Sequence, residues 1–163
     1  MRYTFIFLAI LISTFSGFCF PKEQKPKNVI LVLIDDMGYG DIASHGNPVL
    51  KTPNFDNLYE ASARFTNFAV SPTCAPTRAA IMTGRHEFLV DVTHTISPMN
   101  QMDTDAITIA ELFQRKGYKT GLFGKWHLGQ NDKYGPWFRG FDETLTVPGD
   151  QQNSHFDPVL LHN

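Results

Sequence analysis

Residues 28–36 of the chain read NVILVLIDD, a continuous apolar, β-branched run that ends in two aspartates. A run of this kind suits a strand that is buried on both faces of a parallel sheet. We therefore expect residues 28–34 to form a central strand. Asp35 and Asp36 would then stand directly at its carboxyl end.

Helix signals follow this strand at three places. Pro53 is placed for the first position of one helix. Residues 76–83 predict a short second helix that ends at Gly84 in a left-handed cap. Residues 108–111 read TIAE, a capping box that predicts a third helix. We expect the third helix to end at Gly117 and to bury its apolar side chains, Ile109, Leu112 and Phe113.

Two further strands are predicted between and after these helices, at residues 64–70 (RFTNFAV) and 118–123 (YKTGLF). The alternation of strands and helices favours an α/β sandwich with a mostly parallel sheet. In such sheets ligands bind beyond the carboxyl ends of the strands. Lys125 and His127 follow the last strand as Asp35 and Asp36 follow the first, so parallel strands would place all four on one rim.

The first 20 residues have the layout of a secretory signal peptide. Arg2 gives a positive start, residues 5–12 are apolar, and small or polar residues follow. The apolar run is shorter than the roughly 20 residues that a membrane-spanning helix needs. We expect an exported protein, periplasmic or secreted, without a stable membrane anchor. Residues 21–27 would be a flexible leader and residues 28–163 one domain.

The composition is that of an ordinary globular domain, with 42% hydrophobic and 18% charged residues and a formal net charge of −2. The sequence has no basic stripe and no run of like charge. It therefore gives no sign of nucleic-acid binding.

The adjacent carboxylates of Asp35 and Asp36 can be read in two ways. Like charges this close repel, so they need solvent, protonation or a cation. Oxygen ligands alone would favour a hard ion such as Ca²⁺ or Mg²⁺. The alternative is a solvated turn in which one aspartate caps the next segment.

Cys74 is the one cysteine that remains if Cys19 leaves with the signal peptide. It lies just before a predicted helix, where N–H groups and the helix dipole favour negative charge. Arg78 follows one helical turn later and could reach the same point. The site would suit a thiolate, an oxidised derivative or a bound oxyanion. Alternatively, Cys74 is a small buried hydrophobe and Arg78 a surface residue.

Lys125 and His127 alternate along an extended stretch, so both would point the same way while Trp126 turns into the core. Together they offer a fixed positive charge and a proton donor, which would suit an oxyanion substrate. A lysine that extends to solvent and a capping histidine are the alternative.

Four segments of the chain closely resemble the sulfatase family of the alkaline phosphatase superfamily. Residues 74–78 (CAPTR) are similar to the family's Cys-x-Pro-x-Arg signature, and AAIMTGR continues it to residue 85. The other segments are NVILVLIDDMGYG at residues 28–40, KTPNFDNL at 51–58 and GLFGKWHLG at 121–129.

This resemblance implies that a formylglycine-generating maturation enzyme converts Cys74 to formylglycine. The hydrated aldehyde then attacks the sulfur of a sulfate ester in a small molecule or glycan. It further implies that Asp35, Asp36 and the modified Cys74 ligate a divalent cation, usually Ca²⁺. Arg78 would hold the formylglycine, Lys125 would bind the sulfate oxygens, and His127 would hydrogen-bond the formylglycine hydroxyl.

The chain is shorter than the several hundred residues typical of the family, and the family's later metal ligands have no counterpart in it. We therefore expect a truncated, N-terminal portion of the catalytic domain that is inactive by itself. Two alternatives stay open: a phosphonate or phosphate monoester hydrolase of the same superfamily, and a non-catalytic remnant.

Overall fold

The computed structural model describes residues 27–130, 133–147 and 157–163. The predicted signal peptide and residues 21–26 of the leader lie outside the described residues. The chain divides after Leu33, and every helix and strand given below belongs to the second part, residues 34–163. No helix among the described residues is long and apolar enough to cross a membrane.

Helix α2 (Pro53–Ala61) begins at the predicted proline. Two short 3₁₀ turns, Tyr39–Asp41 and Ala43–His45, precede it. Asp56 ties the second turn to the helix, because its Oδ1 accepts hydrogen bonds from the Ser44 amide at 2.9 Å and the Thr52 hydroxyl at 3.1 Å. The predicted start of this helix at Pro53 is confirmed.

Helix α3 (Cys74–Thr83) begins two residues earlier than predicted, so that Cys74 is its first residue. It ends as expected at Gly84, whose φ of 66° is left-handed and whose N–H donates to the Ala80 carbonyl. Only glycine adopts this backbone region without a steric cost from Cβ. Ala75 and Ala79 are fully buried, and these small side chains let neighbouring segments approach the helix closely.

Helix α4 (Ile109–Arg115) has the predicted capping box. The Thr108 hydroxyl accepts from the Glu111 amide at 3.1 Å, and Glu111 Oε2 accepts from the Thr108 amide at 2.7 Å. Left-handed Gly117 follows its end. The burial prediction is wrong for Ile109 and Leu112, which are exposed, whereas Ala110 is buried. Gly140 approaches the first turn closely at the backbone of Glu111, the residue after Ala110.

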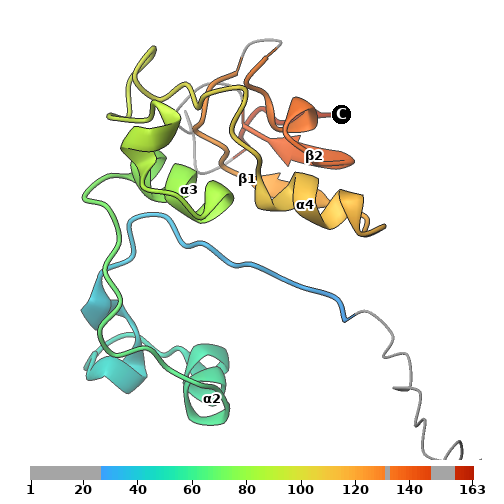
Figure 1. The fold of residues 1–163 in the computed structure, drawn as a ribbon. Coiled ribbons are helices and arrows are strands. Elements are labelled where there is room, and N and C mark those ends of the chain that lie inside the picture. The colour runs from blue at the N-terminus through green and yellow to red at the C-terminus, as the bar shows by residue number, and fades with distance from the viewer. Residues whose placement is uncertain (1–26, 131–132, 148–156) are drawn as a thin grey trace, which may run out of the picture. The chain divides into compact units, whose positions relative to one another are not determined.

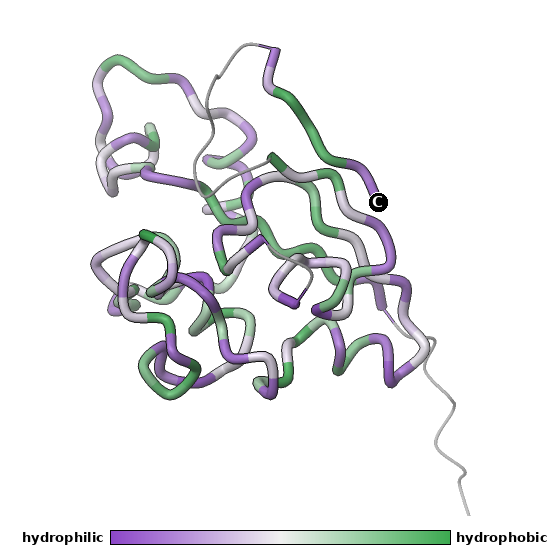
Figure 2. Tube along the Cα trace, turned by 90° about the horizontal axis from the view of Figure 1, so that it is seen from above, coloured by the Kyte–Doolittle hydropathy of each residue, from purple (hydrophilic) through white to green (hydrophobic). Residues whose placement is uncertain are grey.

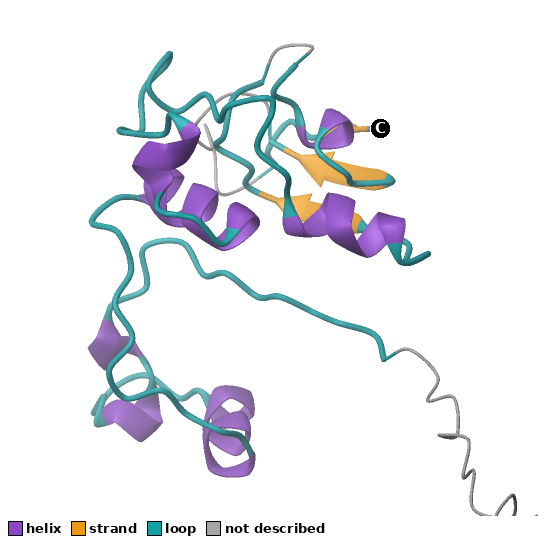
Figure 3. Ribbon diagram, in the orientation of Figure 1, coloured by secondary structure: helices purple, strands orange, loops and turns teal. Residues whose placement is uncertain are grey.

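The sheet has the strand order β1-β2-β3. Strands β1 (Gly121–Gly124) and β2 (Glu143–Thr146) are parallel, and β3 (Leu161–His162) is antiparallel to β2. In Figure 1, α3 and α4 lie beside β1 and β2. The α/β class is confirmed, and β1 overlaps the carboxyl end of the predicted strand (residues 118–123) and extends one residue beyond it. The described sheet is mixed, and long loops connect its elements (Figure 3).

Two predicted strands are absent from the described structure. Residues 28–34 and 64–70 carry no strand assignment, and in the second segment the side chain of Phe65 is 82% accessible. The apolar pattern reports a tendency toward burial, but a strand also needs hydrogen-bonding neighbours. Because neither segment has a strand assignment, these two predictions are wrong for this structure.

The core lies between α3, the Glu87–Val90 turn (η3) and the β1 end of the sheet. Its members are mainly small or aliphatic: Ala75, Ala79, Val90, Val92, Met102, Ala106, Leu122, Trp126 and Leu128. Trp126 is turned into this core as predicted. Figure 2 shows that hydrophobic residues also occur outside it, as in the green stretch just before the C-terminal end of the chain.

Replacing Gly140 with alanine should destabilise the fold by at least about 2 kcal/mol. Gly140 has a φ of 89°, and a Cβ there would lie 2.8 Å from the Glu111 Cα and closer still to its amide nitrogen. Gly40→Ala is the control, because a Cβ there would meet nothing within 4 Å. Urea unfolding measures both variants, and equal stabilities would contradict the packing described for α4.

Asp142 ties the starts of the two parallel strands to helix α4. Its Oδ2 accepts from the Thr120 amide at 2.9 Å, and its Oδ1 accepts from the Gln114 amide group at 2.9 Å. The hydrogen bond from the Thr120 backbone, with further help from Gln114 and the Lys119 charge, lowers the pKa of Asp142 below its usual value despite an opposing desolvation effect.

The carboxylate of Asp142 should therefore stabilise the fold at neutral pH. A depressed pKa gives stability that is present above the unfolded-state pKa and is lost as pH falls through the folded-state pKa. Asp142→Asn should lower the free energy of unfolding at pH 7. At acid pH the free energies of unfolding of the variant and the parent chain should be closer together. Urea unfolding between pH 7 and 3 tests this, with neighbouring Glu143→Gln as the control. If the difference in free energy of unfolding between the parent and Asp142→Asn does not change with pH, the stabilising role given to the ionised Asp142 is refuted.

Candidate active site

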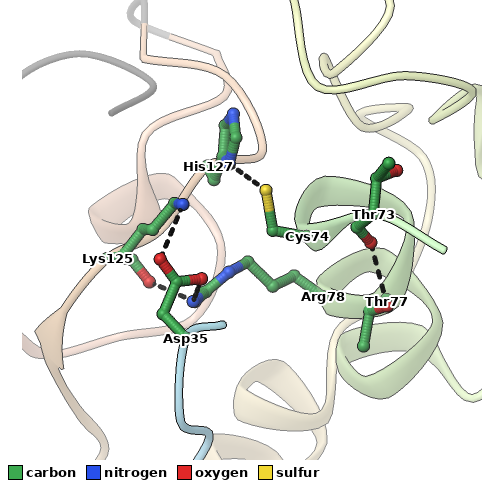
Figure 4. Close-up of polar contacts among 7 residues, drawn as sticks. All are labelled: Asp35, Thr73, Cys74, Thr77, Arg78, Lys125 and His127. Atoms are coloured by element: carbon green, nitrogen blue, oxygen red, sulfur yellow. Dashed lines mark hydrogen bonds and ion pairs between the residues drawn. The ribbon is translucent and has the colours of Figure 1, made fainter. Parts of the chain in front are cut away.

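Cys74 occupies the first position of α3, where backbone N–H groups are not used within the helix and the dipole is positive. The Thr77 hydroxyl donates to the carbonyls of Thr73 and Ser71, at 2.9 and 3.0 Å, and so fixes the chain where it enters the helix. Cys74 is a free, half-buried cysteine. Figure 4 shows its sulfur directed toward His127.

Arg78 lies one turn along α3 and is buried, with 8% of its surface accessible. Its Nη1 donates to the Lys125 carbonyl at 2.6 Å, and its Nη2 donates to Asp35 Oδ1 at 3.1 Å. The guanidinium thereby joins the helix to the segment after β1 and to the segment around Asp35 (Figure 4). The interpretation of Arg78 as a surface residue is wrong.

Asp35 receives a second positive charge from Lys125, whose Nζ is 2.9 Å from Asp35 Oδ2. Partial burial acts to raise the pKa of Asp35, but the hydrogen bonds and charges of Lys125 and Arg78 outweigh it, and the pKa lies below its usual value. Asp35 is therefore ionised at neutral pH, and it partly balances the two cations.

His127 completes the cluster from the segment after β1. It is 1% accessible and has a φ of 65°, a backbone conformation that is uncommon for residues other than glycine. Its Nδ1 lies 3.2 Å from Cys74 Sγ, and its Nε2 lies 2.8 Å from the Thr95 carbonyl oxygen. Sequence reasoning missed Thr95, because a backbone carbonyl can be supplied by any residue type and leaves no signature.

Five of the six residues singled out from the sequence thus lie together: Asp35, Cys74, Arg78, Lys125 and His127 (Figure 4). The sixth, Asp36, is exposed and has a φ of 59°. It makes no hydrogen bond or ion pair with another described residue. Within the described ranges no group of three or more His, Cys, Asp or Glu side chains is placed to hold a metal ion.

This arrangement is suited to chemistry on an anion. Cys74 heads a helix and its sulfur contacts a histidine ring nitrogen, while the Arg78 guanidinium and the Lys125 ammonium lie in the same cluster, joined through Asp35 (Figure 4). Fixed positive groups of this kind stabilise negative charge that develops on oxygen. The site is therefore suited to bind an oxyanion at the start of a helix in an α/β fold.

Residues 27–159 match the sulfatase family. Arylsulfatase G from Homo sapiens is 37% identical over 158 residues, which cover 88% of this chain and 30% of the human protein. N-acetylgalactosamine-6-sulfatase from Mus musculus is 32% identical over 160 residues, covering 91% of this chain and 30% of that protein. The chain belongs to the sulfatase family.

Solved structures agree with this assignment. A protein solved in complex with its substrate D-glucosamine-2-N,6-O-disulfate superposes with a TM-score of 0.68 at 30% identity, covering 79% of this chain and 25% of that one. A sulfatase from Pseudoalteromonas sp. gives a TM-score of 0.61 at 33% identity, with coverages of 72% and 25%. The fold is thus of the alkaline phosphatase-like type, and the chain spans about 30% of the length of the curated relatives quoted above.

Replacing Arg78 with methionine should destabilise the chain by about 2 kcal/mol, the value of hydrogen bonds made by a charged group. The substitution leaves the Lys125 carbonyl and Asp35 Oδ1 without their donor. Arg85→Met is the matched control, because Arg85 lies just beyond α3 and is exposed. Urea unfolding at neutral pH measures the free energy of unfolding of both variants. If Arg85→Met lowers it as much as Arg78→Met does, the role given to Arg78 is contradicted.

Proposed function

We propose that this chain provides the nucleophile-bearing part of a sulfatase, a hydrolase that cleaves sulfate esters. The observation that carries the proposal is the position of Cys74 at the start of α3, inside a Cys-x-Pro-x-Arg segment, with Arg78, Lys125 and His127 around it. Family membership supports the reaction class.

The nucleophile would come from modification of Cys74 by a formylglycine-generating maturation enzyme. Formylglycine in its hydrated form would supply an oxygen nucleophile toward the sulfur of the ester. Cys74 is half-buried and heads a helix, so the group would be held in a fixed direction and would remain open to substrate on one side.

The side chains of Arg78, Lys125 and His127 would hold residue 74 in place and bind the sulfate group. Arg78 is anchored by Asp35 and the Lys125 carbonyl, so it would hold residue 74 and balance charge near it without moving. Lys125 would bind a sulfate oxygen with its ammonium group, which the described structure places 2.9 Å from Asp35. His127 would hydrogen-bond the hydroxyl of residue 74 through Nδ1, the ring atom that contacts Sγ.

A divalent cation, with Ca²⁺ the first candidate, would be held by Asp35, Asp36 and the oxygen of the converted Cys74. The donor chemistry fits, because carboxylate oxygens are the ligands of hard cations and the lowered pKa of Asp35 keeps it ionised. The described residues supply only part of a full ligand set. Such a cation would supply electrostatic stabilisation of the sulfate oxygens.

The substrate would be a sulfated saccharide or a sulfated small molecule. A structural relative at 30% identity is described in complex with a sulfated glucosamine, its substrate, which supports the saccharide class for this chain. We further propose export to the periplasm or the extracellular space, on the basis of the signal-peptide layout of residues 1–20.

Production of the chain with and without a formylglycine-generating enzyme tests the nucleophile directly. Mass spectrometry of the peptide that contains residue 74 should show the change from CH₂–SH to CHO only when the enzyme is present. Cys74→Ala should show no such change, and Thr73→Ala, outside the signature, should still convert. A thiol that persists under all conditions would contradict the proposal.

The reaction class needs a second assay in a whole sulfatase, because the chain spans about 30% of its curated relatives. Residues 27–159 would replace the matching segment of an arylsulfatase, and the chimera would be offered an aryl sulfate and the corresponding aryl phosphate. We expect preferential sulfate cleavage that falls about a thousandfold or more in Cys74→Ala, as for loss of a nucleophile. A phosphate preference would favour the monoester hydrolase alternative.

A further inference from the structure

The imidazole of His127 lies between Cys74 and a loop that the proposed function does not use. Residues 93–101 form this loop, which is closed by hydrogen bonds from the Thr93 and His94 amides to the Met99 carbonyl, at 2.9 and 3.2 Å. Just beyond it, the Met102 amide donates to the carbonyl of Leu128, the neighbour of His127, at 3.3 Å. The loop is thus attached beside the histidine whose ring it contacts.

The contact from the loop is a backbone carbonyl, and this decides where the ring carries its proton. A carbonyl oxygen only accepts hydrogen bonds, so Nε2, at 2.8 Å from the Thr95 oxygen, must be the donor and must bear a hydrogen. In the neutral ring the other nitrogen then has a lone pair. That nitrogen is Nδ1, which lies 3.2 Å from Cys74 Sγ.

We propose that Thr95 is a positioning residue for the site: its main-chain carbonyl fixes His127 in the Nε2–H form and so presents Nδ1 to residue 74 as a hydrogen-bond acceptor. The inference rests on the proposed function for its catalytic meaning, but the geometry applies equally to the unmodified thiol. An S–H or O–H group at residue 74 can donate to this Nδ1.

The opposite form would have the wrong polarity for the reaction. A ring with its hydrogen on Nδ1 would place a donor against a hydroxyl that has to give up its own hydrogen, and it would leave the Thr95 carbonyl facing a lone pair. The His127 ring is buried, and the backbone of the residue is left-handed. Residues held in such sparsely populated backbone regions are commonly found at functional sites.

Nitrogen NMR of the full chain with ¹⁵N-labelled histidine tests the inference without any need for turnover. Ring nitrogen shifts and two-bond couplings distinguish the two neutral forms, and His127→Gln identifies the signal. We expect the Nε2–H form of His127 at a pH where the ring is neutral. Finding the Nδ1–H form in the parent chain would overturn the proposal, whatever the variants do.

A backbone substitution tests whether the Thr95 carbonyl causes His127 to adopt the Nε2–H form. Replacing Ile96 by its α-hydroxy acid turns that carbonyl into a weaker ester acceptor, and the Ile96 N–H that is lost makes no backbone hydrogen bond with other described residues. We expect the ratio of the two forms to shift by up to about fivefold, as for weakening of one hydrogen bond.

Two controls separate this effect from general loosening of the loop. The corresponding ester at Thr95 alters the His94 carbonyl instead, and Thr95→Val keeps the Thr95 carbonyl and removes only the hydroxyl. Both should retain the parent ratio, and a shift in either equal to that of the Ile96 ester would refute the assignment to the carbonyl. An unmodified Cys74 in cells would contradict the sulfatase proposal and leave this result unaffected.

Discussion

The paired hydrogen bonds of Arg78 are the constraint on which the site depends. One guanidinium, fixed on the buried face of α3, binds the carbonyl of Lys125 and the carboxylate of Asp35. These partners come from sequence positions far apart, and each would otherwise be free to move relative to the helix. Because the guanidinium is planar, its two amino groups set both distances at once. Cys74, one turn earlier on the same helix, is thereby placed relative to both segments.

This anchoring also sets the electrostatics around Cys74. Asp35 is shared between Arg78 and Lys125, so each cation is partly neutralised and held in place. A site that kept two unpaired cations together would repel itself, and one with no cations would not attract an oxyanion. The shared carboxylate of Asp35 thus keeps both cations in defined positions. The start of α3 and the His127 ring fix the position of Cys74 beside them.

The sequence predicted the parts of this structure that depend on local chemistry. Caps and breakers such as Thr108 and Gly84 act within a few residues, and the helices they delimit formed close to their predicted positions. Burial patterns were less reliable, because residues 28–34 are apolar but carry no strand assignment, and α4 buries Ala110 rather than Ile109 and Leu112. A strand needs a hydrogen-bonding partner strand, and a buried helix face needs a segment packed against it. The sequence of the strand or helix alone does not specify these neighbours.

In the site, the sequence predicted the side chains that carry the chemistry but not the backbone groups that hold them. Cys74, Arg78, Lys125 and His127 could be singled out because their side chains carry the chemistry. The carbonyls of Lys125 and Thr95 could not, although they hold Arg78 and His127 in place. It follows that a chain can keep every residue of the signature and still lose the geometry, if the segments that supply these two carbonyls shift. Sequence motifs therefore identify the reacting groups, and the loops around them decide whether those groups face one another.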